Sequence, residues 1–229
     1  MLADGWRRRA IAFAAGAIGA LAMPPIGLLP ALFVTMPVAV WLLDGCGAKG
    51  GAGLQRDRFR SAAVAGWFLG FGYFVAGLYW LGAAFLVEPD RFAWALPLGV
   101  LGLPAVLAIF PAIGFVLSLA LWSPGPARIL ALACGLGLSE LARGYLFTGF
   151  PWNDFGMALG QYAPLAQGAS IVGLHGLTPL VIAIAASPAT LTDVTSSRRR
   201  FVPLVIACFG LLVVALFGGL RLSAATVNA

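Results

Sequence analysis

Ionisable residues are scarce in this chain, and two of them, Glu140 and Arg143, stand three positions apart. On a helix this spacing places their side chains next to each other. Charges within an apolar chain are costly to bury, so such a pair either stabilises the end of a helix or serves a bound substrate. The spacing alone favours neither role.

The other residue types that could carry chemistry do not form a set. His175 is the only histidine, and the three cysteines (Cys46, Cys134 and Cys208) are widely spaced, two of them within apolar runs. A cysteine in an apolar run usually packs as a small hydrophobic residue, and we interpret His175 as a residue of helix packing. The sequence therefore predicts no catalytic group, no cofactor and no metal site within this chain.

Aromatic residues gather in two places that could contact lipid. The stretch 144–156, which contains Phe150 and Trp152, is too aromatic for a solvated loop and too rich in glycine and proline for a regular helix. Tyr79 and Trp80 come late in another apolar segment. Trp and Tyr are favoured at membrane interfaces, and we expect both groups at the same face. They either form an aromatic belt, which is the more common arrangement, or line a route by which lipid reaches a site.

The composition indicates what kind of scaffold positions these residues. The chain has 229 residues, of which 61% are hydrophobic and 10% charged, with a mean hydropathy of +0.98. Soluble domains are about 45–50% apolar and about 25% charged, so this composition fits only an integral membrane protein. The net charge of +6 does not indicate nucleic-acid binding, because the basic residues lie in short loops between apolar runs.

Seven apolar segments can be drawn along the chain. They span residues 10–22, 26–43, 61–87, 92–121, 128–142, 165–187 and 201–220. A bilayer-spanning helix needs about 20 such residues, so the predicted fold is all-α, a bundle of about seven transmembrane helices. The first segment also resembles a signal peptide, but the prolines at 24 and 25, followed by more apolar residues, favour a retained, tight helical hairpin.

The arginines predict how the bundle is oriented. If the amino terminus is cytoplasmic, the inside segments hold eleven of the fourteen Lys and Arg residues and the outside segments hold three. The inside residues are Arg7, Arg8, Arg9, Lys49, Arg56, Arg58, Arg60, Arg128, Arg198, Arg199 and Arg200, and the outside ones are Arg91, Arg143 and Arg221. The positive-inside rule then places the carboxyl terminus in the periplasm.

Two further patterns concern helix packing. Pro97, Pro104 and Pro111 recur every seven residues in the fourth segment, which predicts a bent helix with a curved packing face. Gly66 and Gly70 have the spacing that lets two membrane helices approach closely, although such pairs are frequent in a chain with 30 glycines.

Several stretches together resemble the bacterial apolipoprotein N-acyltransferase family. They are Ala22-Met23-Pro24-Pro25-Ile26-Gly27, Gly66-Trp67 through Gly72-Tyr73-Phe74, Gly77-Leu78-Tyr79-Trp80, Glu140-Leu141-Ala142-Arg143-Gly144, Phe147-Thr148-Gly149-Phe150-Pro151-Trp152-Asn153, and Gln167-Gly168-Ala169-Ser170 through Gly176-Leu177-Thr178. The resemblance covers nearly the whole chain, and the run from Phe147 to Trp152 is its most specific part.

This resemblance implies an activity in the bacterial inner membrane. The family transfers a fatty acyl chain from a phospholipid to the amino-terminal, diacylglyceryl-modified cysteine of a lipoprotein. Its catalytic part is a periplasmic nitrilase-like domain with a Glu, Lys and Cys triad, inserted after the seventh span. The cysteine forms a thioester that the lipoprotein amine attacks, which predicts ping-pong kinetics.

The resemblance also carries residue roles onto the membrane part. Trp152 matches a residue implicated in the function of the family. Phe150, Glu140, Arg143, Tyr79 and Trp80 correspond to lipid-contacting or site-supporting positions. His175 stands where an aromatic residue is more usual, so the resemblance gives it no role.

The sequence departs from the family pattern near its carboxyl end. Residues 1–220 form the predicted membrane domain, and 221–229 read as the start of the nitrilase-like domain, whose triad is absent. The expected function is thus the membrane domain of the acyltransferase, inactive by itself. Two alternatives stay open: a split acyltransferase with a separate nitrilase-like chain, and a small-molecule transporter. The acidic residues lie at span ends or in loops, which disfavours transport.

Overall fold

Helices make up the regular structure in the computed structural model of the chain, which describes residues 5–46, 54–193 and 199–227. No strand occurs among these residues. The longer helices are α1 (Trp6–Ala20), α2 (Leu32–Asp44), α3 (Leu54–Gly77), α6 (Ile109–Ala120), α7 (Ala127–Tyr145), α10 (Ala169–Ala186) and α11 (Val202–Val227), and the five-residue α5 (Leu103–Leu107) precedes α6. A helix satisfies its backbone polar groups internally, which is why apolar membrane segments adopt it.

Short helical elements connect the longer ones. They are α4 (Pro89–Phe92), α8 (Met157–Gly160), α9 (Ala163–Ala166), the π-helix η4 (Leu98–Gly102) and the 3-10 helices η1 (Leu29–Ala31), η2 (Tyr79–Leu86), η3 (Ala93–Ala95), η5 (Leu146–Thr148), η6 (Ser187–Thr192) and η7 (Arg199–Phe201).

The fold confirms the predicted all-α integral membrane protein. Each of the seven predicted segments corresponds to a helical stretch, and four stretches in the described residues are long and apolar enough to cross a bilayer. These four are Gln55–Gly77, Pro89–Ala120, Ala169–Thr192 and Arg199–Ala224. The other three are shorter or more charged. For example, α1 has 15 residues and begins with three arginines after Trp6.

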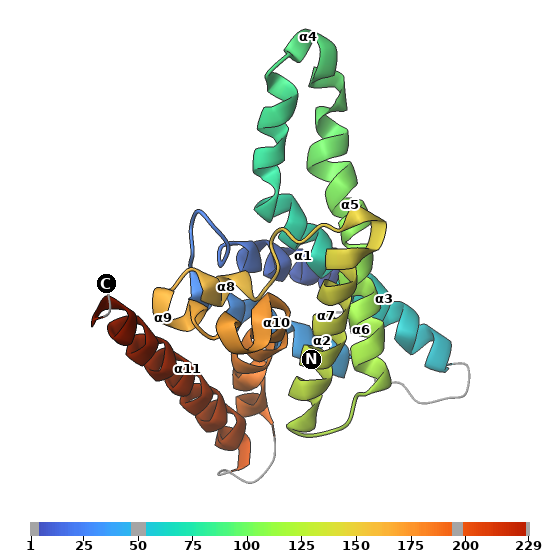
Figure 1. Cartoon of the computed structure of the whole chain (residues 1–229). Coiled ribbons are helices and arrows are strands. Elements are labelled where there is room, and N and C mark those ends of the chain that lie inside the picture. Colours follow the sequence, from blue (N-terminus) through green and yellow to red (C-terminus); the bar gives the residue numbers. More distant parts are fainter. Residues whose placement is uncertain (1–4, 47–53, 194–198, 228–229) are drawn as a thin grey trace.

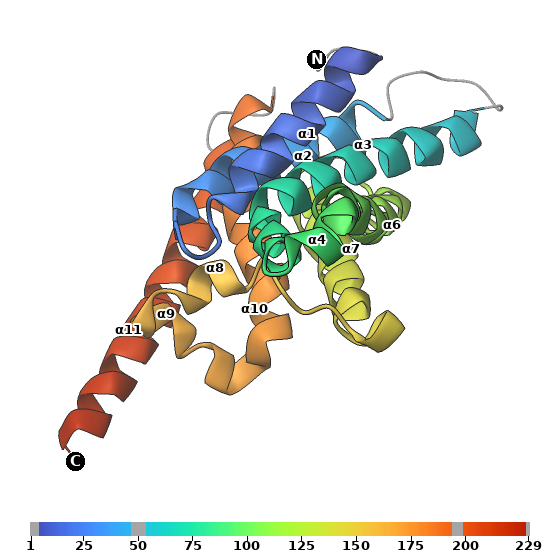
Figure 2. The same ribbon diagram turned by 90° about the horizontal axis from the view of Figure 1, so that it is seen from above.

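The first two helices form the predicted hairpin. The chain turns at Met23–Pro25, and Thr35 Oγ1 on α2 donates a hydrogen bond to the carbonyl of Ala15 on α1 at 2.7 Å. Figure 2 shows α1 also running beside α3. A Cβ atom at Gly16 would lie 1.9 Å from the carbonyl oxygen of Leu69, and one at Gly72 would lie 2.0 Å from that of Phe13. Only glycine permits this backbone contact.

The third predicted segment is not one continuous helix, which corrects the prediction for 61–87. Helix α3 ends at Gly77, and Leu78 has the non-helical angles φ −114° and ψ 12° before η2 begins. The two glycines noted on this helix do allow a close approach, because Cβ atoms at Gly66 and Gly70 would lie 2.6 and 2.7 Å from atoms of Pro111.

The fourth segment lies within one helical stretch, Pro89–Ala120, whose hydrogen-bond pattern changes near its prolines. Pro97 precedes η4, Pro104 lies in the first turn of α5, and α6 begins just before Pro111. Residues 79–107 rise from the bundle as a hairpin with α4 at its tip (Figure 1). The bend thus serves to project this hairpin, while α6 returns to pack against α3 and α7.

At the opposite end, one arginine joins three elements. Arg128 is 5% exposed at the start of α7, and its two terminal nitrogens donate to the Asp193 carboxylate at 3.0 and 2.6 Å. Its Nε lies 3.4 Å from Asp44 Oδ2 at the end of α2. The turn at 122–126 precedes it, and Trp122 also donates to Asp44 at 3.1 Å.

The last two long helices differ from their predicted forms. Helix α10 contains a break at Gly173, where φ is 68° and ψ is 179°. Helix α11 lies along one side of the bundle against α9, α10 and η6 (Figure 1). It continues through residues 221–227, which the sequence assigned to a following domain; that domain assignment stays a prediction, and 228–229 lie outside the described residues.

Candidate functional site

Arg143 holds the segment that follows α7 in place. Its side chain is 1% exposed, and one terminal nitrogen donates hydrogen bonds to the carbonyls of Phe150 and Trp152, the latter at 2.8 Å. The backbone N–H of Phe150 in turn donates to the carbonyl of Arg143 at 2.9 Å. A guanidinium offers five donors in a planar fork, so one side chain can fix two turns of irregular backbone.

Glu140 completes this arrangement from the preceding turn of α7. Its carboxylate, also 1% exposed, accepts from Arg143 Nη2 and from Nε at 3.4 Å. The guanidinium also lies over the ring of Phe74, 5.1 Å from its centroid. The predicted side-by-side pair is therefore present. It is buried beneath the stretch 144–156, which we call the aromatic segment. A charge buried this deeply needs both a counter-ion and hydrogen bonds, and Arg143 has them.

The segment departs from helical geometry where the sequence predicted it would. Phe147 and Asn153 adopt left-handed backbone angles, with φ of 53° and 56°. Asparagine tolerates this conformation better than most residues. The carbonyl of Asn153 accepts a hydrogen bond from the Tyr73 hydroxyl at 2.9 Å, which ties the segment to α3. The segment is thus anchored by α7 at two carbonyls and by α3 at a third.

The ring of Trp152 lies on the outside of this anchored backbone. It is 52% exposed and packs against the ring of Trp80, with the centroids 5.1 Å apart. Two residues far apart in the sequence thus meet, which goes further than the expectation that both lie at the same face. Tyr79 is 62% exposed beside Trp80, and Phe150 is partly buried against the core.

The close approach of the two segments depends on Gly77. A Cβ atom there would lie 2.2 Å from the side-chain nitrogen of Asn153. The end of α3 at Gly77 therefore places Asn153 directly against the helix and brings Trp80 to Trp152.

A second buried carboxylate was missed by the sequence analysis. Asp154 is 2% exposed, accepts from the N–H of Gly156 at 2.8 Å and from the Thr178 hydroxyl, and lies 3.8 Å from Nδ1 of His175. These contacts join the segment to α10. An acidic residue next to asparagine ahead of glycine is typical of a turn that caps its own backbone, which was the available signal.

The structure thus brings five of the six predicted site residues into one region. Glu140 and Arg143 lie beneath it, Phe150 lies within it, and Trp152 and Trp80 lie on its outer side. Tyr79 adjoins Trp80 in the chain and is 62% exposed. No group of three or more metal-ligating side chains occurs in the described part of the chain. The arrangement can bind an apolar chain against two indole rings, and it contains a fixed backbone rather than a nucleophile.

Comparison with known proteins shows which family the chain is similar to. Residues 15–187 match the family described as the apolipoprotein N-acyltransferase N-terminal domain. An apolipoprotein N-acyltransferase of Rhodopseudomonas palustris is 52% identical over 97% of this chain and 41% of its own length. One from Bradyrhizobium diazoefficiens is 50% identical over 97% and 41%, and one from Brucella suis is 50% identical over 84% and 36%. The chain spans about two fifths of the length of these relatives.

Proposed function

The chain belongs to the apolipoprotein N-acyltransferase family, as its amino-terminal part, and from this premise we propose that it binds and orients lipid substrates for acyl transfer. The donor would be a membrane phospholipid and the acceptor a diacylglyceryl lipoprotein, with transfer to the amino group of the amino-terminal cysteine. The protein would work as a multi-pass protein of the bacterial inner membrane.

The observation that carries this proposal is the pair of indole rings on an immobilised backbone. The rings of Trp80 and Trp152 are half exposed and in contact, while buried side chains hold the carbonyls around Trp152. Indole rings combine a large apolar face with one polar donor, which suits the boundary between acyl chains and headgroups.

Each predicted site residue takes a distinct part in this proposal. Trp152, Trp80 and Tyr79 would contact the acyl chain, and Phe150 would form the floor beside them. Glu140 and Arg143 would position the segment rather than contact lipid, because both are 1% exposed. Asp154 and Tyr73 would be further positioning residues.

The chemical step itself is proposed to use groups outside this chain. Family members acylate through a nitrilase-like triad, and no residue here matches that motif. The catalytic domain would act on lipid presented at the periplasmic end of α3, either as part of a longer polypeptide or as a separate chain.

Binding and turnover can be measured together in defined liposomes. The chain is reconstituted with phosphatidylethanolamine and a dansyl-labelled diacylglyceryl lipopeptide, and energy transfer from tryptophan reports binding. We expect lipopeptide binding that weakens about fivefold to tenfold in Trp152→Ala, since a large aromatic contact contributes on the order of 1–1.5 kcal/mol. Trp6→Ala, at the far end of the molecule and equally a lost indole, is the matched control.

Acylation of the lipopeptide is followed by mass spectrometry in the same samples. No N-acyl product is expected from this chain alone. Product formation would show that the chain carries its own catalytic groups. Equal binding by wild type and Trp152→Ala would remove the indole pair from the site.

A further inference from the structure

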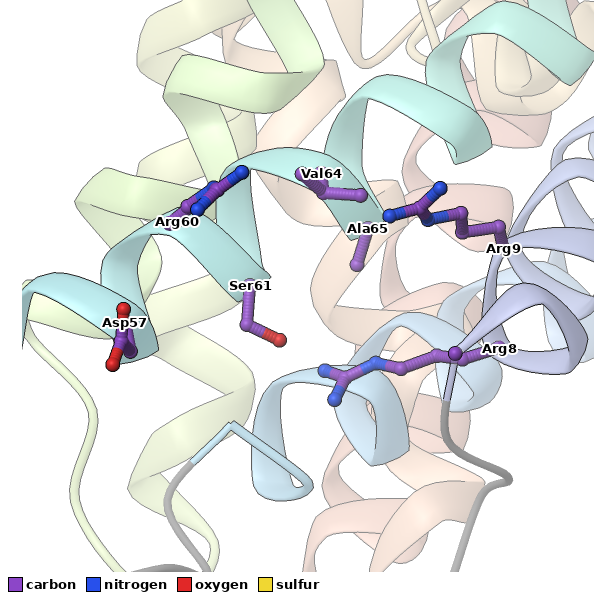
Figure 3. A pocket seen from close by; sticks show the side chains of 8 residues that line it. Arg8, Arg9, Asp57, Arg60, Ser61, Val64 and Ala65 are labelled. Atoms are coloured by element: carbon purple, nitrogen blue, oxygen red, sulfur yellow. The ribbon is translucent and has the colours of Figure 1, made fainter. Parts of the chain in front are cut away.

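A second region, at the opposite end of α3 from the indole pair, combines a pocket with unpaired positive charge. The pocket has a volume of about 260 Å³ and lies between the first turn of α1 and the first three turns of α3. Its lining residues are Gly5, Arg8, Arg9, Asp57, Arg60, Ser61, Val64 and Ala65. Figure 3 shows Arg8 and Arg9 reaching from α1 toward α3, with Arg60 on the other side of Val64.

Three arginines and one carboxylate leave this pocket with a formal charge of 3 − 1 = +2. Among the described residues, no ion pair or hydrogen bond neutralises Arg9 or Arg60, and Arg9 rests only against the ring of Phe68, 5.8 Å from its centroid. Arg8 donates to the carbonyl of Leu42 at 2.5 Å and to Cys46 Sγ at 2.8 Å, so its position is fixed. Guanidinium groups that line one pocket repel each other, and a bound anion would relieve that repulsion.

The position of the pocket along α3 decides what kind of anion fits. Arg60 and Ser61 lie within the membrane-spanning stretch Gln55–Gly77, near its beginning. Val64 and Ala65 follow one turn further in. The site therefore offers guanidinium and hydroxyl donors at the depth of headgroups and an apolar wall where a glycerol backbone and acyl chains begin.

Membrane orientation alone does not explain this arrangement. The positive-inside rule needs arginines in loops near the ends of spans, and Arg7 and Arg56 already meet that need without lining the pocket. The rule does not require two helices to direct arginines into one cavity with an apolar inner side.

We propose that this pocket binds the phosphodiester headgroup of an anionic phospholipid, in the leaflet that faces the arginine-rich end of the bundle. Arg9 and Arg60 contact the phosphate from opposite sides, Arg8 and Ser61 provide further donors, and Val64 and Ala65 contact the start of the acyl chains. Arginine suits this role because its fork matches phosphate oxygens, and basic pockets between membrane helices are known to bind such headgroups. This site is separate from the indole pair and does not depend on acyl transfer.

Native mass spectrometry of the detergent-purified chain tests the proposal. The probes are phosphatidylglycerol, phosphatidylethanolamine and inorganic phosphate. We expect phosphatidylglycerol to be retained in preference to phosphatidylethanolamine. The double variant Arg9→Gln/Arg60→Gln should bind it roughly tenfold to thirtyfold more weakly, because each basic residue near an anionic surface contributes about fivefold.

The matched control is Arg7→Gln/Arg56→Gln, which removes two charges from the same helices outside the pocket. It should keep wild-type retention of phosphatidylglycerol. A second variant, Val64→Trp, fills the pocket while leaving every charge in place, and it should also lose the lipid. Thermal unfolding of each variant shows whether it is folded. If Arg9→Gln/Arg60→Gln does not fold, the retention of phosphatidylglycerol by Val64→Trp decides whether the pocket binds the lipid.

Three results would overturn the proposal. One is equal loss of lipid in the two double variants, which would indicate a general charge effect. Another is unchanged phosphatidylglycerol retention in both Arg9→Gln/Arg60→Gln and Val64→Trp. The third is displacement of the lipid by millimolar inorganic phosphate that itself binds the chain, which would identify a site for a soluble anion.

Discussion

Arg143 is the residue on which the aromatic segment most depends. Its side chain satisfies the carbonyls of Phe150 and Trp152 while its charge is balanced by Glu140. An irregular backbone inside a membrane protein must find hydrogen-bond partners within the protein, because lipid offers none. The ion pair is thus a means of holding a non-helical segment at the end of α7.

Replacing Arg143 with glutamine should therefore destabilise the protein. The change leaves Glu140 as a buried, unpaired carboxylate and frees two carbonyls, and breaking such a pair costs about 3 kcal/mol or more. The measurement is thermal unfolding in detergent. Arg91→Gln is the control. Arg91 pairs with Glu88 at the same spacing of three positions, but on an exposed surface, where an ion pair contributes about 0–1 kcal/mol.

A double variant separates charge from hydrogen bonding. Glu140→Gln/Arg143→Gln removes the unpaired charge and should recover part of the stability lost in Arg143→Gln. If the single arginine variant unfolds at the wild-type temperature, Arg143 does not anchor the segment.

At the scale of single residues, the sequence predicted which residues form the site better than how deeply they are buried. The spacing of Glu140 and Arg143 predicted their pairing, and the two aromatic clusters predicted a shared face for Trp80 and Trp152 but not the contact of their rings. It did not indicate that the ion pair lies beneath the segment, because burial depends on how α7 packs against α6 and α10. Tyr73, Asn153 and Asp154 were missed for the same reason: their partners lie on elements distant in the sequence.

Among the elements, α3 makes close backbone contacts with two neighbouring helices. It packs against α1 through Gly16 and Gly72 and against α6 through Gly66 and Gly70. Membrane helices associate through close packing, with no hydrophobic driving force between them. Small residues along two sides of α3 therefore determine how tightly the bundle closes.

Adding a side chain at the α1–α3 contact should separate the two helices. Gly72→Val puts a Cβ atom 2.0 Å from the carbonyl oxygen of Phe13, and overpacking of this kind costs about 1–3 kcal/mol. Unfolding in detergent measures the loss. Gly210→Val on α11, where nothing lies within 4 Å of the added atom, should unfold close to wild type. Equal effects at the two positions would contradict the packing argument.

Helix boundaries were the weakest part of the sequence prediction, for a clear physical reason. Hydropathy alone continues the third segment to residue 87, yet α3 ends at Gly77, where the Asn153 side chain occupies the space that a side chain would need. The break of α10 at Gly173 has a different cause, because φ is 68° there while nothing lies within 4 Å of an added Cβ atom. Apolar composition predicts that a segment enters the membrane and gives no information on where tertiary contacts bend it.

At the scale of the whole molecule, the two ends of α3 have different chemistry. One end carries the indole pair, and the other carries the arginine-lined pocket. A 24-residue helix is about 36 Å long, enough to place these two regions at opposite faces of a bilayer. The orientation predicted from the arginines puts the indole pair at the periplasmic face.

Labelling of single cysteines tests that orientation. In a chain with Cys46, Cys134 and Cys208 replaced by serine or alanine, Arg91→Cys at the hairpin tip should react with an impermeant maleimide in intact spheroplasts. Arg7→Cys at the other end should react only after lysis. The reverse pattern would invert the bundle, and the pocket would then face the outer leaflet.

In Trp152, the position of the backbone and the nature of the ring are independent of each other. Its carbonyl is held by Arg143, and its neighbours' carbonyls by Arg143 and Tyr73, while the indole makes no contribution to this anchoring. The ring can therefore be exchanged while the backbone stays in place. Fluorotryptophan at this one position would act as a spectroscopic reporter whose fluorine resonance tests whether acyl chains reach and leave this ring.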